Sequence, residues 1–412
     1  MKDRIIFHID VNSAYLSWES VSLLAKDPDA IDLRTIPSAV GGDQSKRHGI
    51  ILAKSESAKQ FGVQTGEPLV DALRKCPTLT IVPPHHDLYE EYSRSFHQIL
   101  RQYTPIVEKM SVDEAFCDMT ASIQPGQESV LLACEIKDRI LRELGFSVNI
   151  GVAPNKILAK MASDFQKPNR VHTLFYDEVP VKLWPLPVRD LYFVGNVTEK
   201  KLATLGIHTI GELAHADLTI LRSHLKKQGE MIYAYANGID DSPVSAEAHR
   251  YKGYGNSTTI SFDVEDAFTA KQIIRSLCET VGARLRQDQV VARVVTIEIK
   301  NQEFITCSHQ RTVSFPTNST NQIYDIAASL FDEIWDGSPI RLLGVRTGKI
   351  TEEENLQMNL FDWEKQEKQN KLDLAIDQIR NKYGENSIMR ASFLEEDRFH
   401  HMTGKKKKGL AK

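Results

Sequence analysis

The alternation of apolar and polar residues in the first half of the chain predicts a domain of mixed strands and helices. Residues 4–10 and 146–152 are apolar runs of strand length. Apolar residues recur at helical spacing over 88–103 and over about 128–144. Residues 109–118, which lie between these two helices, are predicted to form a short strand. This order of strand, helix, strand, helix and strand predicts an α+β sheet domain.

Two further segments have different patterns. Residues 31–83 contain a strand-like run and then a short helix that ends at Gly62. Residues 185–240 contain short helices with tight turns, and the turn at Gly195 predicts a helix-hairpin-helix. In that motif a glycine turn leaves backbone N–H groups at a helix start free to hold a DNA phosphate. Gly195 is therefore a candidate DNA-binding residue.

The C-terminal part of the chain has a third pattern. A polar stretch at about 240–256 indicates a linker. Beyond it a compact βαββαβ unit is predicted over 250–350, with strands at 257–262, 291–299, 308–315 and 341–349 and helices at 269–286 and 319–334. In the tail, 351–412, an apolar stripe predicts a helix without a domain to pack on. The stripe consists of Leu372, Ile376, Ile379 and Tyr383.

Composition restricts the class of protein. The 412 residues are 41% hydrophobic and 26% charged, which is typical of a globular protein with two to four domains. No run of 18 apolar residues occurs, so no membrane span is expected, and the N-terminus leads into a strand and not into a signal peptide. Five scattered cysteines without a CxxC pair indicate a reducing cytoplasm and argue against structural zinc. The net charge of −4 implies that any DNA-binding surface is local, and the basic end at 405–408 is typical of a solvated terminus.

Three carboxylates carry the candidate chemistry. Asp113 and Glu114 are adjacent in an apolar strand, and Asp10 ends the first buried strand. Neighbours on a regular strand point to opposite faces, so either one of the pair faces solvent, or the strand bends and both serve one site. Asp10 alone could equally be a turn or helix-capping residue. Together, three carboxylates on neighbouring strands are what Mg²⁺ needs, and two such ions can support an in-line displacement on phosphorus.

The segments around these carboxylates add candidate partners. Residues 10–19 predict a strand-to-helix turn, in which Asn12 or Ser13 can cap the helix. Tyr15 follows early in that helix, where it could approach Asp10 or simply be a core aromatic residue. A lysine cluster at 156–167 would suit a triphosphate near an acidic site, although such lysines are often only a solvated helix face.

These motifs together resemble the Y-family translesion DNA polymerases of the bacterial DinB/UmuC type. The matching segments are 10–15, 58–63, 111–115 and 155–168, and the likeness covers residues 1 to 350 and extends to the tail. The resemblance implies a multidomain right-hand polymerase with a flexible C-terminal tail. Its domains would be a palm at 1–13 and 84–174, fingers at 14–83, a helical thumb at 175–240, a little finger at 250–350, and a clamp-binding tail at 351–412.

The resemblance also implies roles for single residues. Asp10, Asp113, Glu114 and the Val11 carbonyl would hold two Mg²⁺. Lys59 and Lys167 would contact the incoming triphosphate, and Tyr15 would be a steric gate against the ribose 2′-hydroxyl. The clamp-binding peptide at 357–361 would bind the sliding clamp through Gln357, Leu360 and Phe361.

Some positions depart from the family pattern. Glu56 stands where many members have a tyrosine, and an acid there would repel phosphate. Ile50 and Leu52 stand where DinB-type members often have smaller residues, which bears on the tolerance of bulky lesions. Phe193 replaces the first glycine of the usual hairpin, which weakens the predicted phosphate contact.

The implied reaction adds deoxynucleotides to a primer 3′-hydroxyl opposite and past damaged template bases. We see no second acidic cluster of exonuclease type, so low fidelity without proofreading is expected. The expected partners are primer–template DNA, deoxynucleoside triphosphates and the sliding clamp, around a monomeric core in the cytoplasm at the nucleoid. The alternatives are a nucleotidyl cyclase and a catalytically inactive DNA- and clamp-binding accessory protein.

Overall fold

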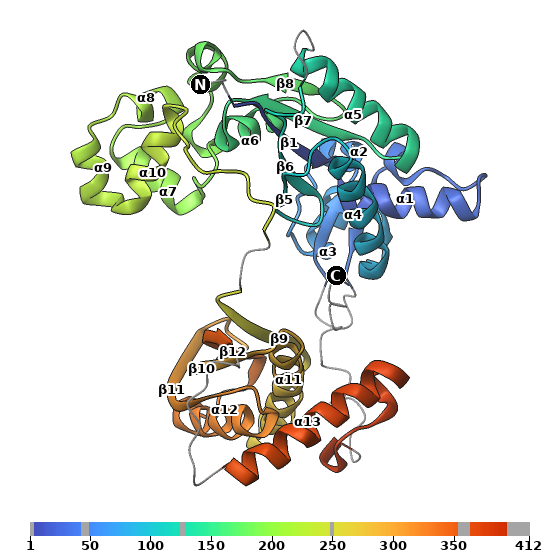
Figure 1. Cartoon of the computed structure of the whole chain (residues 1–412), viewed down its shortest axis with the longest axis vertical. Helices are drawn as coiled ribbons and strands as arrows, with labels where there is room; N and C mark the ends of the chain where they lie inside the picture. Colours follow the sequence, from blue (N-terminus) through green and yellow to red (C-terminus); the bar gives the residue numbers. More distant parts are fainter. Residues whose placement is uncertain (1–3, 43–48, 124–127, 248–250, 353–362, 394–412) are drawn as a thin grey trace. The chain divides into compact units, whose positions relative to one another are not determined.

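The computed structural model describes residues 4–42, 49–123, 128–247, 251–352 and 363–393 (Figure 1). The chain divides into two compact units, one ending near residue 248 and the other beginning there. Each unit is described by itself.

The first unit contains a five-stranded sheet with β1 at its centre. The sheet order is β5 (Val107–Lys109), β6 (Glu114–Asp118), β1 (Ile6–Val11), β7 (Val148–Ala153) and β8 (Val171–Thr173). Strand β1 is buried throughout and pairs antiparallel with both β6 and β7. The predicted α+β domain is confirmed.

Alternation along β1 divides the sheet into two differently occupied faces. Phe7, Ile9 and Val11 pack in a core with α4 (His86–Arg101) and α5 (Ser129–Leu144). The residues between them lie on the face covered by α6 (Lys156–Asp164), because successive strand side chains point to opposite sides. Gly151 on β7 allows this helix to approach: a Cβ atom there would lie 2.0 Å from the Ala159 carbonyl oxygen.

The prediction of one strand over 109–118 is wrong in part. Strands β5 and β6 form a hairpin, and the residues between them turn. The N–H groups of Met110 and Ser111 both donate to the Glu114 carbonyl, at 3.1 and 3.2 Å. Asp113 and Glu114 therefore lie where the chain leaves the hairpin turn and enters β6. The chain bends here, as it must if both carboxylates are to serve one site.

A three-stranded sheet follows β1 in the chain. Its order is β3 (Ile51–Lys54), β2 (Ser38–Gly41) and β4 (Thr80–Val82). The helices of this segment are α1 (Ala14–Lys26), η1 (Leu33–Thr35), α2 (Glu56–Gln60) and α3 (Leu69–Lys75). Gly62 follows α2 with φ of +79°, a conformation that favours glycine, so the predicted helix end is confirmed.

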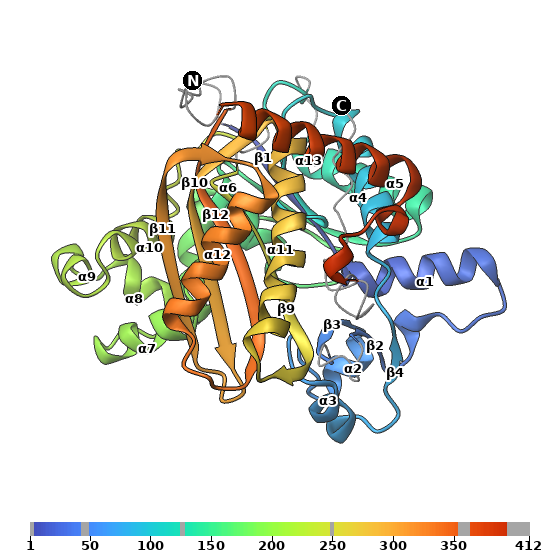
Figure 2. The same ribbon diagram turned by 90° about the horizontal axis from the view of Figure 1, so that it is seen from below.

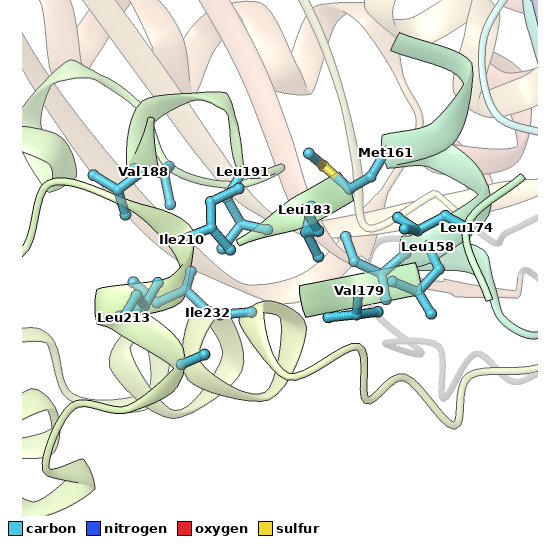
Figure 3. Close-up of a cluster of buried hydrophobic side chains, with 14 of the residues drawn as sticks. Leu158, Met161, Leu174, Val179, Leu183, Val188, Leu191, Ile210, Leu213 and Ile232 are labelled. Carbon is cyan, nitrogen blue, oxygen red and sulfur yellow. The ribbon is translucent and has the colours of Figure 1, made fainter. Parts of the chain in front are cut away.

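Short helices make up the rest of this unit. They are η3 (Tyr176–Glu178), the π-helical turn η4 (Val179–Leu183), η5 (Val188–Asp190), α7 (Asn196–Thr204), α8 (Ile210–Ala214), α9 (Leu218–Leu225) and α10 (Lys227–Ala236). Their core is continuous with that of α6: Leu158 and Met161 lie beside Leu174 and Val179, and Leu183 joins them to Ile210 (Figure 3). This packing attaches the short helices to the sheet domain.

The second unit has the predicted βαββαβ order. Its sheet runs β11 (Thr306–Thr317), β10 (Val290–Asn301), β12 (Ile340–Glu352) and β9 (Gly253–Val264). Helices α11 (Ala267–Gln287) and α12 (Thr320–Ile334) cover one face of this sheet (Figures 1 and 2). Among the described residues, no helix of this unit covers the opposite face.

Helix α13 (Trp363–Tyr383) corrects the prediction of a helix without a domain to pack on. It lies against α11 (Figure 2), and charged side chains of the two helices form ion pairs. The Arg286 guanidinium contacts Asp373 and Asp377 at 3.5 and 2.7 Å, and Arg380 contacts Glu279 at 2.9 Å. The short helices η7 (Glu385–Ser387) and η8 (Ala391–Phe393) follow, and Phe393 is fully buried in the core of this unit. Leu372, Ile379 and Tyr383 of the predicted stripe remain exposed.

Candidate active site

Three carboxylates meet at one end of the five-stranded sheet. Asp10 is the cross-strand partner of Glu114, and the Val11 N–H donates to the Asp113 carbonyl at 3.0 Å. Asp10 is buried, and the other two are partly buried. The structure thus brings together the three residues that the sequence selected, with Val11 at the end of β1.

Burial and mutual repulsion disfavour the ionised forms of two of these groups. Burial raises the pKa of Asp10, the charge of Glu114 adds to that effect, and the ammonium groups of Lys167 and Lys160 oppose it. Burial also raises the pKa of Asp113; a hydrogen bond from Ser111 at 2.5 Å opposes this, while the charge of Asp10 reinforces it. Such concentrated negative charge is characteristic of a functional site.

Two lysines offset part of this charge in the structure. Lys160 lies 2.8 Å from Glu114 and 3.3 Å from Asp164, and Lys167 contacts Asp10 and lies 2.8 Å from Asp164. Burial alone would lower the pKa of either lysine, but the neighbouring carboxylates raise both above the usual value. Both lysines are therefore held as cations against the carboxylates.

The donor set fits a hard divalent cation, although the present side-chain arrangement does not enclose one. Among the described residues, no group of three or more His, Cys, Asp or Glu side chains is gathered closely enough to hold a metal ion. Instead, the ammonium groups of Lys160 and Lys167 form ion pairs with the carboxylates of Glu114 and Asp10. Because carboxylate and carbonyl oxygens are the ligands that Mg²⁺ takes, the residues present suit that ion once the lysines release them.

A network of buried amides, which the sequence analysis missed, supports the loop that carries Lys167. The Asn12 side chain donates to Asn149 at 3.2 Å and accepts from the Ser147 hydroxyl at 3.0 Å and the Asn169 N–H at 2.9 Å. Asn149 in turn donates to the Gln166 carbonyl at 2.8 Å. The signal for Asn149 was a polar residue inside a buried apolar strand, which needs a partner.

The helix that begins at Ala14 has no side-chain cap. Ser13 occupies the capping position with a left-handed backbone, φ of +46°, and its hydroxyl makes no capping bond. Asn12 uses its side chain for the amide network. The prediction that one of these two residues caps the helix is therefore wrong.

Tyr15 lies next to the carboxylates, at the start of α1. Its ring stacks on Tyr89 with centroids 4.4 Å apart and planes 9° apart. The Tyr89 hydroxyl donates to buried Glu19 at 2.5 Å, which fixes the stack from behind. Burial raises the pKa of Tyr15, and the nearby charge of Asp113 adds to it, so the half-buried ring is near the acidic site.

Lys59 was predicted to contact the triphosphate, but the structure does not place it among the carboxylates and lysines of the acidic site. Within the described residues, its exposed ammonium group pairs with Glu56 at 3.6 Å on α2. Glu56 therefore pairs with Lys59, which was expected to contact phosphate. Ile50 is also exposed, while Leu52 is partly buried in the adjoining strand.

The candidate hairpin turn has an unusual backbone. Gly195 precedes α7 with φ of −90°, which any residue can adopt, whereas Phe193 has φ of +71°. The left-handed region is costly for a residue with a side chain, so Phe193 occupies the position that favours glycine. Gly195 and Asn196 are exposed, which leaves the N-terminal turn of α7 accessible.

The sheet face of the second unit that lies opposite α11 and α12 is hollowed. A cavity of about 830 Å³ spans all four strands. Glycines at 253, 255, 344 and 348 line it, together with the cationic Lys252 and Arg346 and the anionic Glu298. Glu298 lies 3.8 Å from the Arg346 guanidinium. At Gly253 a Cβ atom would lie 2.2 Å from the Thr347 carbonyl oxygen, so no other residue fits there without a shift of the backbone.

Comparison with known proteins identifies the family. The impB/mucB/samB family matches residues 9–164, its C-terminal domain matches 251–360, and its HHH motif matches 176–207. The chain is 43% identical over 394 residues to DNA polymerase IV of Clostridium acetobutylicum, covering 96% of this chain and 99% of the relative. It is 39% identical over 399 residues to DNA polymerase IV 1 of Bacillus subtilis, covering 96% and 94%.

A solved structure agrees in fold. The Y-family DNA polymerase chimera Dbh-Dpo4(243-245)-Dbh superimposes with a TM-score of 0.74 at 22% identity, over 84% of this chain and 99% of that one. The fold and site thus define a Y-family DNA polymerase. The chain belongs to the impB/mucB/samB family within that class. No helix in the described part of the chain is long and apolar enough to cross a membrane.

Proposed function

We propose that this protein is a template-directed DNA polymerase that extends primers opposite and past damaged template bases. The observation that carries the proposal is the pairing of Asp10 with Glu114 across β1 and β6, with Asp113 beside them at the same sheet end. Close carboxylates on rigid strands are retained at a cost in stability, which is expected where they serve chemistry.

The family resemblance and the positions of these residues support a role for each of them. Asp10, Asp113, Glu114 and the Val11 carbonyl would hold two Mg²⁺, which supply charge neutralisation at the reacting phosphate and lower the pKa of the primer 3′-hydroxyl. Lys167 exchanges its contact with Asp10 for the triphosphate, since its raised pKa keeps it cationic.

Tyr15 and Lys59 complete the nucleotide site. The Tyr15 ring, stacked on Tyr89, packs against the sugar of the incoming nucleotide. Lys59 reaches the triphosphate only by leaving Glu56, and both side chains are exposed enough for that exchange to be inexpensive.

The surfaces for DNA lie in both units. The exposed turn at Gly195 offers backbone N–H groups to a phosphate, and the hollowed sheet face with Arg346 contacts the duplex backbone. The sliding clamp would bind Gln357, Leu360 and Phe361, which lie outside the described residues, as does the basic end at 405–408. We expect the enzyme to act as a monomer at the cytoplasmic nucleoid.

Primer extension with the purified full chain tests this function. The wild type should extend a primer on a plain template and past a lesion, whereas Asp113→Ala should abolish extension and retain DNA binding. Asp118→Asn is the matched control, because Asp118 is on the same strand β6 but pairs with Ile6 at the far end of β1. Cyclic nucleotide formation without extension would support the cyclase alternative. Clamp and DNA binding without extension would support the accessory protein.

A further inference from the structure

Asn149 is a polar residue in the buried and otherwise apolar strand β7. It is the cross-strand partner of Asp10, on the other side of β1 from Glu114, and its side chain is fully buried. Asparagine is rarely buried to this extent unless its polar atoms have partners. The partners of this amide therefore indicate why a polar residue is kept beside the acidic site.

The Asn149 amide is fully hydrogen-bonded. Its Nδ2 donates to the Ser163 carbonyl at 3.1 Å and to the Gln166 carbonyl at 2.8 Å. Its Oδ1 accepts from the Arg170 N–H and from Nδ2 of Asn12, both at 3.2 Å. Main-chain carbonyls can only accept and main-chain N–H groups can only donate, so these contacts fix which atom of the amide is the oxygen.

Asn12 continues the network from the end of β1. Its Oδ1 accepts from the Asn169 N–H at 2.9 Å and from the Ser147 hydroxyl at 3.0 Å. Asn169 has φ of +59°, and a residue with a side chain keeps such a left-handed backbone only where its surroundings hold it there. The bond to Asn12 is one of these restraints.

The segment held by the two amides is 166–170, and Lys167 lies inside it. The chain is anchored before the lysine through the Gln166 carbonyl and after it through the N–H groups of Asn169 and Arg170. With its backbone fixed on both sides, the lysine can change partners by rotation of its side chain alone.

A role in stability explains only part of this network. Carbonyl groups in the last turn of a helix lack partners within the helix, and the bond from Asn149 to Ser163 at the end of α6 satisfies one of them. The Gln166 carbonyl also lies 3.1 Å from Nε2 of His172, so it has a second partner. The bonds to the N–H groups of residues 169 and 170 lie beyond the helix end, and they restrain the chain on the far side of Lys167.

We propose that Asn149 and Asn12 are positioning residues for Lys167. Their amides hold the backbone of 166–170 against the ends of β7 and β1, so that the ammonium group turns from a fixed point between Asp10 and the triphosphate of the incoming nucleotide. This inference rests on the proposed function in taking Lys167 as a triphosphate contact. A misplacement of about 1 Å in such a group can cost about 100-fold in rate.

Hydrogen exchange of the full chain without DNA or nucleotide tests the anchoring. Asn149→Ala removes all four bonds of that amide, whereas Asn12→Ala removes the bond to Asn169 and leaves Asn149 its bonds to main-chain groups. Both variants should exchange faster in peptides that span 166–170, as measured by mass spectrometry, and melting temperatures are recorded for each. If Asn149→Ala does not fold, Asn12→Ala alone decides the result. Unchanged protection of 166–170 would overturn the proposal.

A matched control comes from the short helices of the same unit. Asn237 is partly buried and donates to the Ala214 and Tyr233 carbonyls at 3.1 and 3.0 Å. Asn237→Ala therefore also removes an amide with two carbonyl partners, but none of them lies in 166–170. It should leave exchange in that segment as in the wild type.

A double-mutant cycle shows whether the amides act through the lysine. The quantity measured is kcat/KM for the next deoxynucleotide at saturating primer–template. Asn149→Ala should lower it by about 10- to 100-fold in the wild-type background. In the Lys167→Ala background the same substitution should lower it by less than about threefold, because the group that it positions is gone. Asn12→Ala should follow the same pattern with a smaller loss, and Asn237→Ala should stay within about threefold of wild type.

Two results of the cycle overturn the inference. Equal losses from Asn149→Ala in both backgrounds would mean that the amide supports the fold independently of Lys167. Wild-type kcat/KM in Asn149→Ala and Asn12→Ala would mean that the anchors are not needed. The proposed function fails in a different way: wild-type kcat/KM in Lys167→Ala would remove the lysine from the nucleotide site and the inference with it, and a wild type that does not extend primers would reject the polymerase itself.

Discussion

Asp10 on β1 and Glu114 on β6 are direct cross-strand partners, so two carboxylates stand opposite each other at the end of a buried strand pair. Like charges at such positions destabilise a sheet. The fold tolerates the pair because Lys167 contacts Asp10 and Lys160 contacts Glu114, while Asp164 lies between the two lysines. The two lysines thus offset part of the negative charge of this acidic site.

The hairpin turn of the short helices offers a test of backbone strain. Phe193 has φ of +71°, and its exposed ring contacts Tyr192 with centroids 4.4 Å apart. Phe193→Ala and Phe193→Gly both remove the ring, but only alanine keeps the Cβ that the left-handed region disfavours. We expect the glycine variant to be more stable than the alanine variant by about 1 kcal/mol in urea denaturation. At an ordinary backbone position the glycine variant would be the less stable of the two by a similar amount. An alanine variant that is more stable than the glycine variant here would therefore contradict the strain.

The charged contact between α11 and α13 predicts a large loss from a single substitution. Glu279 is buried and accepts from Arg380 at 2.9 Å and Arg390 at 2.6 Å. Glu279→Ala leaves two arginines without their carboxylate, which costs about 3–5 kcal/mol for a buried pair. Hydrogen exchange should then show α13 losing protection. Asp332→Ala, which removes the exposed partner of Lys271 in the same unit, should change stability by less than about 1 kcal/mol.

Sequence patterns predicted the elements well where burial alternates regularly. The βαββαβ unit is an example, because its strands and helices each have one apolar face and short loops between them. The three carboxylates were also found from sequence, since an acid next to a buried apolar run is conspicuous.

Patterns failed where a contact depends on residues distant in the chain. Helix α13 packs with Asp373 and Arg380 and not with its apolar stripe, and a charged face gives no periodic hydrophobic signal. The hairpin at Glu114 was missed because its turn has neither Gly nor Pro. Asn149 was hidden in an apolar run, although a polar residue there is itself a signal. The roles of Lys59 and Tyr15 stay predictions, since they depend on a bound nucleotide.

A buried histidine gives the first unit a defined acid sensitivity. His97 on α4 is buried and donates through Nδ1 to the Ser93 carbonyl at 2.7 Å. Burial lowers its pKa to about 4, and the hydrogen bond to Ser93 opposes this. Because the unfolded chain takes up this proton near pH 6.5 and the folded chain near pH 4, stability is full above 6.5 and declines as the pH falls through this window.

The loss from this one group amounts to roughly 3 kcal/mol by pH 4. Urea titrations at several pH values, followed by tryptophan fluorescence, measure it. In His97→Leu the slope of stability against pH should decrease by up to one proton. His224→Gln, at an exposed position of the same unit, should leave the slope unchanged. Parallel slopes for wild type and His97→Leu would contradict the buried neutral form.

Clamp binding by the peptide at 357–361 is a prediction that can be tested without disturbing α13. A deletion from Gln357 would also remove Arg380 and Arg390, which leaves Glu279 buried without its partners. Leu360→Ala with Phe361→Ala avoids this. Two apolar anchors can contribute about 2 kcal/mol or more each at an interface, so clamp affinity should fall by orders of magnitude while basal extension persists.

Surface plasmon resonance with immobilised clamp gives the affinity. Leu372→Ala is the matched control, because Leu372 is an exposed apolar residue of the same C-terminal segment but lies outside the peptide. Unchanged clamp affinity in the double variant would reject the motif.

Sugar selection is the sharpest test of the nucleotide site, and it depends on Tyr15. Asp10 lies at the strand end, and Tyr15 follows five positions later in the first turn of α1. The ring is held by its stack on Tyr89, and the charge of Asp113 is close enough to raise its pKa. We therefore expect a ring fixed beside the carboxylates to pack against C2′ of a nucleotide bound there.

A ribose differs from a deoxyribose at this contact only by its 2′-hydroxyl. Packed against the Tyr15 ring, that hydroxyl has neither room nor a hydrogen-bond partner, so its exclusion is on the order of several kcal/mol. Tyr15→Ala should therefore raise ribonucleotide incorporation by orders of magnitude and affect deoxynucleotide use far less. The measurement is kcat/KM for a matched ribo- and deoxyribonucleotide, with a melting curve for each variant.

A tyrosine that serves only the core predicts a different result. Tyr15 also borders the apolar cluster around Trp18, so its loss could lower stability and reduce the use of both sugars equally. Tyr92→Ala is the control for that effect, because Tyr92 stacks on the same tryptophan from α4. If Tyr15→Ala and Tyr92→Ala both melt earlier and neither changes the ratio of the two sugars, Tyr15 is a packing residue. A shifted ratio in Tyr15→Ala alone assigns it to the discrimination of the sugar.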